Sequence, residues 1–152
     1  MSEASTNKDL TNDLTGWSLG EKKIIKDAIA SDDYSGAIKI LEGLGFQLIV
    51  DTPSAAKYLT GSNRKYPALI YSKYGKEYTA EISKFCSNAD YKEALGDAIK
   101  TVMICFEKEP DGKGKKATYN IKDKQLNIVL NGEYLCHSAD TIELKKFLEK
   151  SL

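Results

Sequence analysis

The stretch ATYNIKDKQLNIVLNGEYLCH, residues 117–137, decides the fold of this chain. Hydrophobic and polar residues alternate along it, which is typical of strands with one buried face. The pattern is interrupted at Asp123-Lys124 and at Asn131-Gly132, and Asn-Gly is the strongest short signal for a type I′ hairpin turn. The stretch therefore predicts a three-stranded antiparallel meander, with strands at Ala117–Lys122, Gln125–Leu130 and Glu133–His137.

Two-residue turns also define the register of these strands. Ile121 is expected opposite Leu126, Tyr119 opposite Ile128, and Ile128 opposite Leu135. All these side chains share one face, so turn chemistry and hydrophobic alternation agree. The residues that follow predict a C-terminal helix lying on that face, with a buried stripe formed by Leu144, Phe147, Leu148 and Leu152.

The N-terminal part predicts a polar tail followed by helices. Residues 1–15 are expected to form a mobile tail, and residues 16–152 a single globular α+β domain. Ser18 and Glu21 form a capping-box pattern at the start of a helical pair. A short buried strand is expected at Phe46–Val50.

The central part predicts one further strand and one long helix. Tyr66–Tyr71 is expected to be an edge strand, because Pro67 cannot donate to a ladder. A core helix is expected from the 3.6-residue spacing of Tyr91, Ala94, Leu95, Ala98, Ile99, Val102, Met103 and Phe106. The predicted fold is α+β, with an N-terminal helical pair, a central mixed α/β region and a C-terminal three-stranded antiparallel meander closed by a C-terminal helix. The two earlier strands, Phe46–Val50 and Tyr66–Tyr71, are expected to extend the meander into a larger sheet.

The composition limits the available chemistry. Twenty-one lysines accompany a single arginine, Arg64, and a single histidine, His137. Lysine does not reproduce the bidentate fork with which arginine binds phosphate, and histidine is the usual proton shuttle and metal ligand. Basic and acidic residues both number 22, so the summed charge attracts no strongly charged partner. These features count against phosphoryl transfer, zinc chemistry and base readout.

Cysteine usage and hydropathy indicate a compartment. The three cysteines are an odd number without paired spacing, which favours a reducing environment over a disulfide framework. No apolar run approaches the 18 residues of a membrane span. We therefore expect a soluble, cytoplasmic protein without membrane association.

The cysteines do not form a recognisable catalytic or metal-binding pattern. Cys136 and His137 are adjacent in a predicted strand and should project to opposite faces, which prevents the imidazole from activating the thiol. Structural zinc sites use paired spacing that Cys86 and Cys105 lack. We expect no metal and no cofactor, although the sequence leaves open an enzyme with an unrecognised site around Cys86 or Cys105.

A tyrosine-rich segment is the main candidate for a binding surface. Tyr58, Tyr66, Tyr71, Tyr74 and Tyr78 fall within 21 residues and surround Arg64. Tyrosine and arginine are enriched among the residues that dominate binding energy at interfaces. If this segment binds a partner, Arg64 should be exposed. At least two of Tyr66, Tyr71 and Tyr74 should reach the same solvent-facing patch. The alternative reading is that these tyrosines are packed in the core.

The leading functional hypothesis is a non-catalytic protein-binding module, such as an inhibitor, immunity protein or adaptor. A compact, charge-balanced domain without a catalytic constellation acts mainly through its surface. The alternative is a nucleic-acid-associated accessory protein that uses Lys113, Lys115 and Lys116 in the loop before the meander, with tyrosine stacking. The balanced charge and single arginine count against nucleic acid. The outer face of the meander around Val129 and Tyr134 is the next candidate surface.

Overall fold

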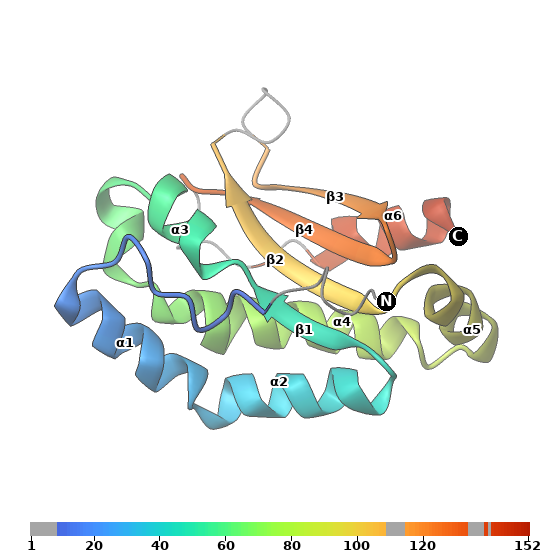
Figure 1. Ribbon diagram of the computed structural model, residues 1–152. Coiled ribbons are helices and arrows are strands. Elements are labelled where there is room, and N and C mark those ends of the chain that lie inside the picture. Colours follow the sequence, from blue (N-terminus) through green and yellow to red (C-terminus); the bar gives the residue numbers. More distant parts are fainter. Residues whose placement is uncertain (1–8, 109–114, 134–138, 140) are drawn as a thin grey trace.

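A computed structural model describes residues 9–108, 115–133, 139 and 141–152 of the chain (Figure 1). It contains both helices and a mixed four-stranded sheet, so the predicted α+β class is confirmed. The elements, in chain order, are α1 (Leu19–Ile29), α2 (Asp32–Gly43), β1 (Gln47–Val50), α3 (Thr52–Tyr58), η2 (Gly61–Lys65), η3 (Ile70–Tyr74), α4 (Gly75–Phe85), α5 (Ala89–Ala98), β2 (Thr101–Glu107), β3 (Ala117–Lys122), β4 (Gln125–Asn131) and α6 (Thr141–Ser151).

The sheet has the strand order β1-β2-β4-β3. β1, β2 and β4 run parallel to one another, and β3 is antiparallel to β4 at one edge. The predicted pairings of Ile121 with Leu126 and of Tyr119 with Ile128 are confirmed. The turn between β3 and β4 has positive φ angles at both central residues, 53° at Asp123 and 63° at Lys124. These angles are those of a type I′ turn, which matches the twist of the flanking strands.

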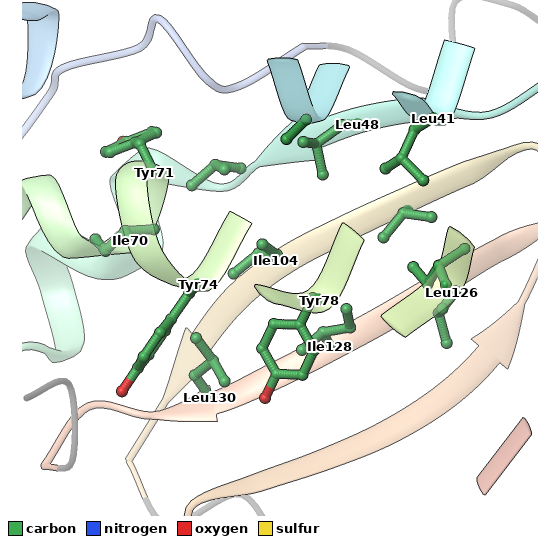
Figure 2. Close-up of a cluster of buried hydrophobic side chains, with 14 of the residues drawn as sticks. Leu41, Leu48, Ile70, Tyr71, Tyr74, Tyr78, Ile104, Leu126, Ile128 and Leu130 are labelled. Atoms are coloured by element: carbon green, nitrogen blue, oxygen red, sulfur yellow. The ribbon is translucent and has the colours of Figure 1, made fainter. Parts of the chain in front are cut away.

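One face of the sheet forms the core against the helices. Alternate residues of β2 and β4, such as Ile104 and Ile128, are fully buried. Figure 2 shows these side chains facing Tyr74 and Tyr78, which come from the helical layer. The helices α1, α2 and α4 lie together on one side of the strands in Figure 1. The buried side chains at every second position of the strands thus pack against the apolar stripes of the helices.

The opposite face of the sheet carries a row of amide side chains. Gln125 Nε2 donates to Asn127 Oδ1 at 2.6 Å, and Asn127 Nδ2 donates to Asn120 Oδ1 at 2.9 Å. These side chains alternate in sequence with the buried Leu126 and Ile128. The alternation explains why β3 and β4 could be predicted from the sequence.

The long helix predicted through Phe106 is wrong in its second half. The helix α5 ends at Ala98, and Thr101–Glu107 forms the central strand β2. Its apolar run is buried between two neighbouring parallel strands, where near-continuous hydrophobicity is usual. Such a run also matches helical spacing, so its periodicity does not distinguish the two structures.

The strand predicted at Tyr66–Tyr71 is also wrong. Ile70–Tyr74 forms a π-helical turn that continues directly into α4. Tyr71, Tyr74 and Tyr78 are all buried and recur at helical spacing along this continuous element. The spacing of the tyrosines therefore reflects one buried helical face.

The position expected for the third meander strand is occupied by β2. β4 pairs with β3 along one edge and with β2 along the other. Ile128 accordingly pairs with Tyr119 and Ile104, so its expected pairing with Leu135 is wrong. Asn131-Gly132 does not form the expected type I′ turn, since neither residue is among those with positive φ. Residues 134–138, including Tyr134, Cys136 and His137, lie outside the described part.

Residues 9–15, expected to belong to a mobile tail, contact the sheet and α3. The backbone N–H of Val50 donates to Thr11 Oγ1 at 3.0 Å, and Thr52 Oγ1 donates to the Thr11 carbonyl oxygen at 2.7 Å. Thr11 itself is 3% exposed. The mobile-tail expectation is therefore wrong at Thr11, because its polar groups complete the hydrogen bonding of buried residues.

Candidate functional site

Arg64 makes a network of contacts within the molecule. Its Nε and Nη2 atoms donate to the two carboxylate oxygens of Glu21, at 3.0 and 3.1 Å. Nη1 donates to the carbonyl oxygen of Ala56, and Nη2 to that of Gly16 at 2.8 Å. The side chain is only 27% exposed. The expectation of an exposed Arg64 is wrong, because its donors join η2 to α1 and α3.

The tyrosines expected beside Arg64 do not share a surface. Tyr71 and Tyr74 are 0% and 4% exposed, whereas Tyr66 is 57% exposed. The Tyr71 hydroxyl lies 2.6 Å from Thr52 Oγ1, inside the core. Figure 2 shows Tyr71 and Tyr74 among the buried side chains. The expected joint exposure is therefore wrong, and of the four predicted partner-binding residues only Tyr66 is readily accessible to a partner.

The lysines of the predicted loop lead to a different candidate. Lys113 lies outside the described residues, but Lys115 and Lys116 are exposed at the start of β3. Both line a groove of about 540 Å³ between β3 and α6. The other lining residues are Ala117, Thr118, Tyr119, Glu143, Lys146, Phe147 and Lys150. We name this site the β3–α6 groove.

The helical wall of the groove follows from the pattern of α6. Glu143, Lys146, Phe147 and Lys150 have the spacing i, i+3, i+4, i+7, so they form one stripe of the helix. The adjacent stripe contains Leu144 and Leu148, both fully buried in the core. Burial of the leucines therefore sets the rotation of α6 and turns the lysine stripe toward β3.

The floor of the groove is aromatic. The rings of Tyr119 and Phe147 lie with their centroids 5.9 Å apart and their planes at 34°. Both side chains are half-buried and pack against the core. The Tyr119 ring also contacts Tyr78 from α4, at 6.3 Å between centroids. The core thus supports an apolar surface that stays partly accessible from the groove.

The strand wall of the groove is the outer edge of the sheet. The Asn131 N–H donates to the Lys116 carbonyl oxygen at 2.8 Å, which places this pair at a hydrogen-bonded position of the antiparallel ladder. Hydrogen-bonded and non-hydrogen-bonded pairs alternate, so the backbone groups of Ala117, Tyr119 and Ile121 point away from β4. The two-residue turn after Lys122 leads to the same assignment of the backbone groups that point away from β4. The groove therefore borders backbone N–H and C=O groups directed outward.

The described residues of the groove carry mostly positive charge. Among those that line it, Lys115, Lys116, Lys146 and Lys150 are all exposed, and Glu143 is the single carboxylate. The lysines of the groove are thus placed to attract an acidic ligand at short range, although the whole chain has no net charge.

The two cysteines in the described part are poor nucleophiles. Burial, together with the smaller effect of the nearby carboxylates of Asp51 and Glu107, raises the pKa of the Cys105 thiol to about 12. Burial also raises the pKa of Cys86. Both thiols are therefore protonated near neutral pH, whereas the thiolate is the reactive form. Within the described ranges, no group of three or more His, Cys, Asp or Glu residues is arranged to hold a metal ion.

The comparisons add no family assignment. Family models, curated proteins and solved structures were all compared with the chain, and none matches it. In the part of the chain that the structure describes, none of the helices combines the length and apolar character needed to cross a membrane.

The sequence pointed to one side of the groove only. Lys115 and Lys116 could be proposed from the basic loop, whereas Lys146 and Lys150 were missed. Their spacing of one helical turn beside the buried leucine stripe was a usable signal, because it places two charges together at the edge of the core-facing side.

Proposed function

We propose that this protein is a non-catalytic binding module of the inhibitor, immunity-protein or adaptor type, and that it binds a partner protein through the β3–α6 groove. The observation that carries the proposal is the combination of four lysines, an aromatic floor and an outward-facing strand edge in one depression. Aromatic area with a polar surround is typical of interface centres.

The fold gives the groove rigid walls. Tyr119 contacts Tyr78, and Leu144 and Leu148 attach α6 to the core. A site on packed strands and helices loses little conformational entropy when a partner binds. The proposal relocates the predicted binding surface from the tyrosine segment, where Tyr71 and Tyr74 are buried, to the edge of the sheet.

Charge reversal tests the proposal. Lys146→Glu with Lys150→Glu should abolish recovery of a stoichiometric partner protein from a nuclease-treated host lysate. Lys26→Glu with Lys39→Glu makes the same change in net charge at exposed positions of α1 and α2 and should leave recovery intact. Thermal unfolding of each variant measures whether the fold is preserved. Equal recovery with both double variants would show that partner binding does not use the groove.

A nucleic-acid ligand is the second candidate, because lysines and stackable rings also characterise sites for single strands. The groove unites Lys115 and Lys116 with Tyr119 and Phe147. The zero net charge and the structural engagement of Arg64 weigh against it. Under this hypothesis, replacing Lys113, Lys115 and Lys116 by alanine lowers the slope of log affinity against log salt by up to ~3. An unchanged slope, or no binding at low salt, removes it.

A further inference from the structure

We infer that the β3–α6 groove binds its partner by strand addition, taking up an extended acidic segment that pairs with β3. The inference rests on the proposed function and specifies its ligand. In this binding mode, backbone hydrogen bonds to a sheet edge supply affinity and side-chain contacts supply specificity.

The position of β3 provides the backbone half of this recognition. Among the described residues β3 is the terminal strand of the sheet, and the backbone groups of Ala117 and Ile121 are directed away from β4. The strand extends over Ala117–Lys122, so its edge offers roughly 20 Å for pairing. The three consecutive lining residues Ala117, Thr118 and Tyr119 border the groove, although their side chains alternate between faces. The groove therefore follows the edge itself.

The helix α6 provides the side-chain half. Every second side chain of an added strand would face α6, where Lys146 and Lys150 accompany Phe147. The two lysines are one turn apart, a rise of ~6 Å along the helix axis. Alternate residues of a strand are spaced by ~6.6 Å, which is similar. Carboxylates at alternate positions can thus approach both lysines.

The charges favour an acidic partner over a second copy of this chain. Lys115, Lys116 and Lys122 lie on or beside the edge strand, and all three are exposed. Pairing two β3 edges would bring these like charges together, and lysine on edge strands is a known safeguard against such association. An acidic segment turns the same lysines into attractive contacts.

A proline substitution separates strand addition from simple charge attraction. Ala117→Pro removes an outward N–H at the first residue of the strand, where proline is tolerated, and leaves the bonds between β3 and β4 in place. Ala117→Ser keeps the N–H and is the matched control. The probe is a synthetic peptide of about eight alternating glutamate and valine residues, similar in length to β3.

The inference predicts that Ala117→Pro weakens peptide binding by about ten-fold or more, whereas Ala117→Ser changes it by less than about two-fold. In the unaltered chain, the peptide should slow hydrogen exchange at the amides of Ala117 and Ile121. This second measurement does not depend on the folding of any variant. Loss of peptide binding with Lys146→Glu and Lys150→Glu should accompany both results.

Three outcomes would overturn strand addition. Full binding by Ala117→Pro, with no added protection at the edge amides, would leave the groove as a charge-dependent site and the proposed function intact. Tighter binding of an eight-nucleotide thymidine oligonucleotide than of the peptide would favour the nucleic-acid alternative. Concentration-dependent dimers that occlude the edge would identify a second copy as its occupant. Retention of the natural partner by the charge-reversed variant would instead contradict the proposed function itself.

Discussion

The guanidinium carbon of Arg64 lies 4.4 Å from the centroid of the Trp17 ring. Trp17 is 5% exposed, and its Nε1–H donates to the Thr52 carbonyl oxygen at 3.1 Å. The arginine therefore stacks on a side chain that is itself attached to the start of α3. Together with its ion pair to Glu21, this stacking links η2, α1 and α3 at one point.

Arg64→Lys should destabilise the fold even though it retains the charge. A lysine has three donors on one nitrogen, so it cannot reproduce the four hydrogen bonds that Arg64 makes to Glu21, Ala56 and Gly16, and it lacks the planar stacking surface. We expect a loss of roughly 1–3 kcal/mol in the free energy of unfolding, measured in urea. Tyr66→Ala, at an exposed position nearby, should change it by less than ~0.5 kcal/mol. Equal effects would show that the Arg64 network contributes nothing specific.

Glu21 should make stability depend on pH in the acid range. Hydrogen bonds from Arg64 and from the Ser18 backbone lower the pKa of Glu21 from 4.5 to about 2. A lowered pKa means that the contribution of Glu21 is complete above pH 4.5 and is lost as the pH falls toward 2. Glu21→Gln should therefore be less stable than the original chain at pH 6, and the difference should shrink toward pH 2. Urea unfolding at several pH values measures this, and a constant difference would contradict the ion pair.

Gly132→Ala should be strongly destabilising. A Cβ at this position would overlap the carbonyl oxygen of Tyr58 and lie 2.6 Å from its carbonyl carbon. The obstacle is backbone at the end of α3, so relief requires movement of α3 or β4. We expect a loss of ~2 kcal/mol or more in urea unfolding.

Gly36→Ala is the control for this substitution. Gly36 lies within α2, and a Cβ there would have open space. Alanine should stabilise this helix by roughly 0.5–1 kcal/mol. Similar destabilisation at both positions would show that close approach to Tyr58 is not what requires Gly132.

Gly132 and the neighbouring β3–β4 hairpin show where sequence-based prediction succeeded and where it failed. The β3–β4 register could be predicted, because alternation and a two-residue connection are local properties. Asn131-Gly132 has the stronger turn signal, yet the glycine is needed for a contact with Tyr58, far away in the sequence. The Gly132 N–H also donates to the Glu107 carbonyl oxygen at 3.0 Å, in continuation of the pairing with β2. A local motif cannot distinguish a turn from a close approach.

The groove could be predicted in part for a similar reason. The amphipathic α6 and the edge of the meander were both visible in the sequence, and Lys115 and Lys116 were named. Their assembly with Lys146 depends on how α6 rotates over the core, which is decided by the packing of Leu144 and Leu148. The prediction of a binding surface at the tyrosine segment was wrong because enrichment in tyrosine is common to interfaces and to cores.

Tyr71 and Tyr34 form a matched pair that tests the reassignment of the tyrosine segment to the core. Their rings meet edge to face, with centroids 5.4 Å apart, and both are buried. The Tyr71 hydroxyl lies 2.6 Å from Thr52 Oγ1, which donates to Thr11, so Tyr71 is the donor of this pair. The Tyr34 hydroxyl is buried beside the Thr11 side chain, and it has no hydrogen-bond partner of good geometry among the described residues.

Tyr71→Phe should therefore lower the free energy of unfolding by about 0.5–1.5 kcal/mol, the usual net contribution of one intramolecular hydrogen bond. Tyr34→Phe removes a polar group that gains nothing from burial, and it should be neutral or stabilising. Neither change should alter partner affinity per folded molecule, because both rings lie beneath the surface. Stability is read from urea unfolding and affinity from calorimetry. A loss of affinity for Tyr71→Phe without a loss of stability would restore Tyr71 as a binding residue and move the partner site away from the β3–α6 groove.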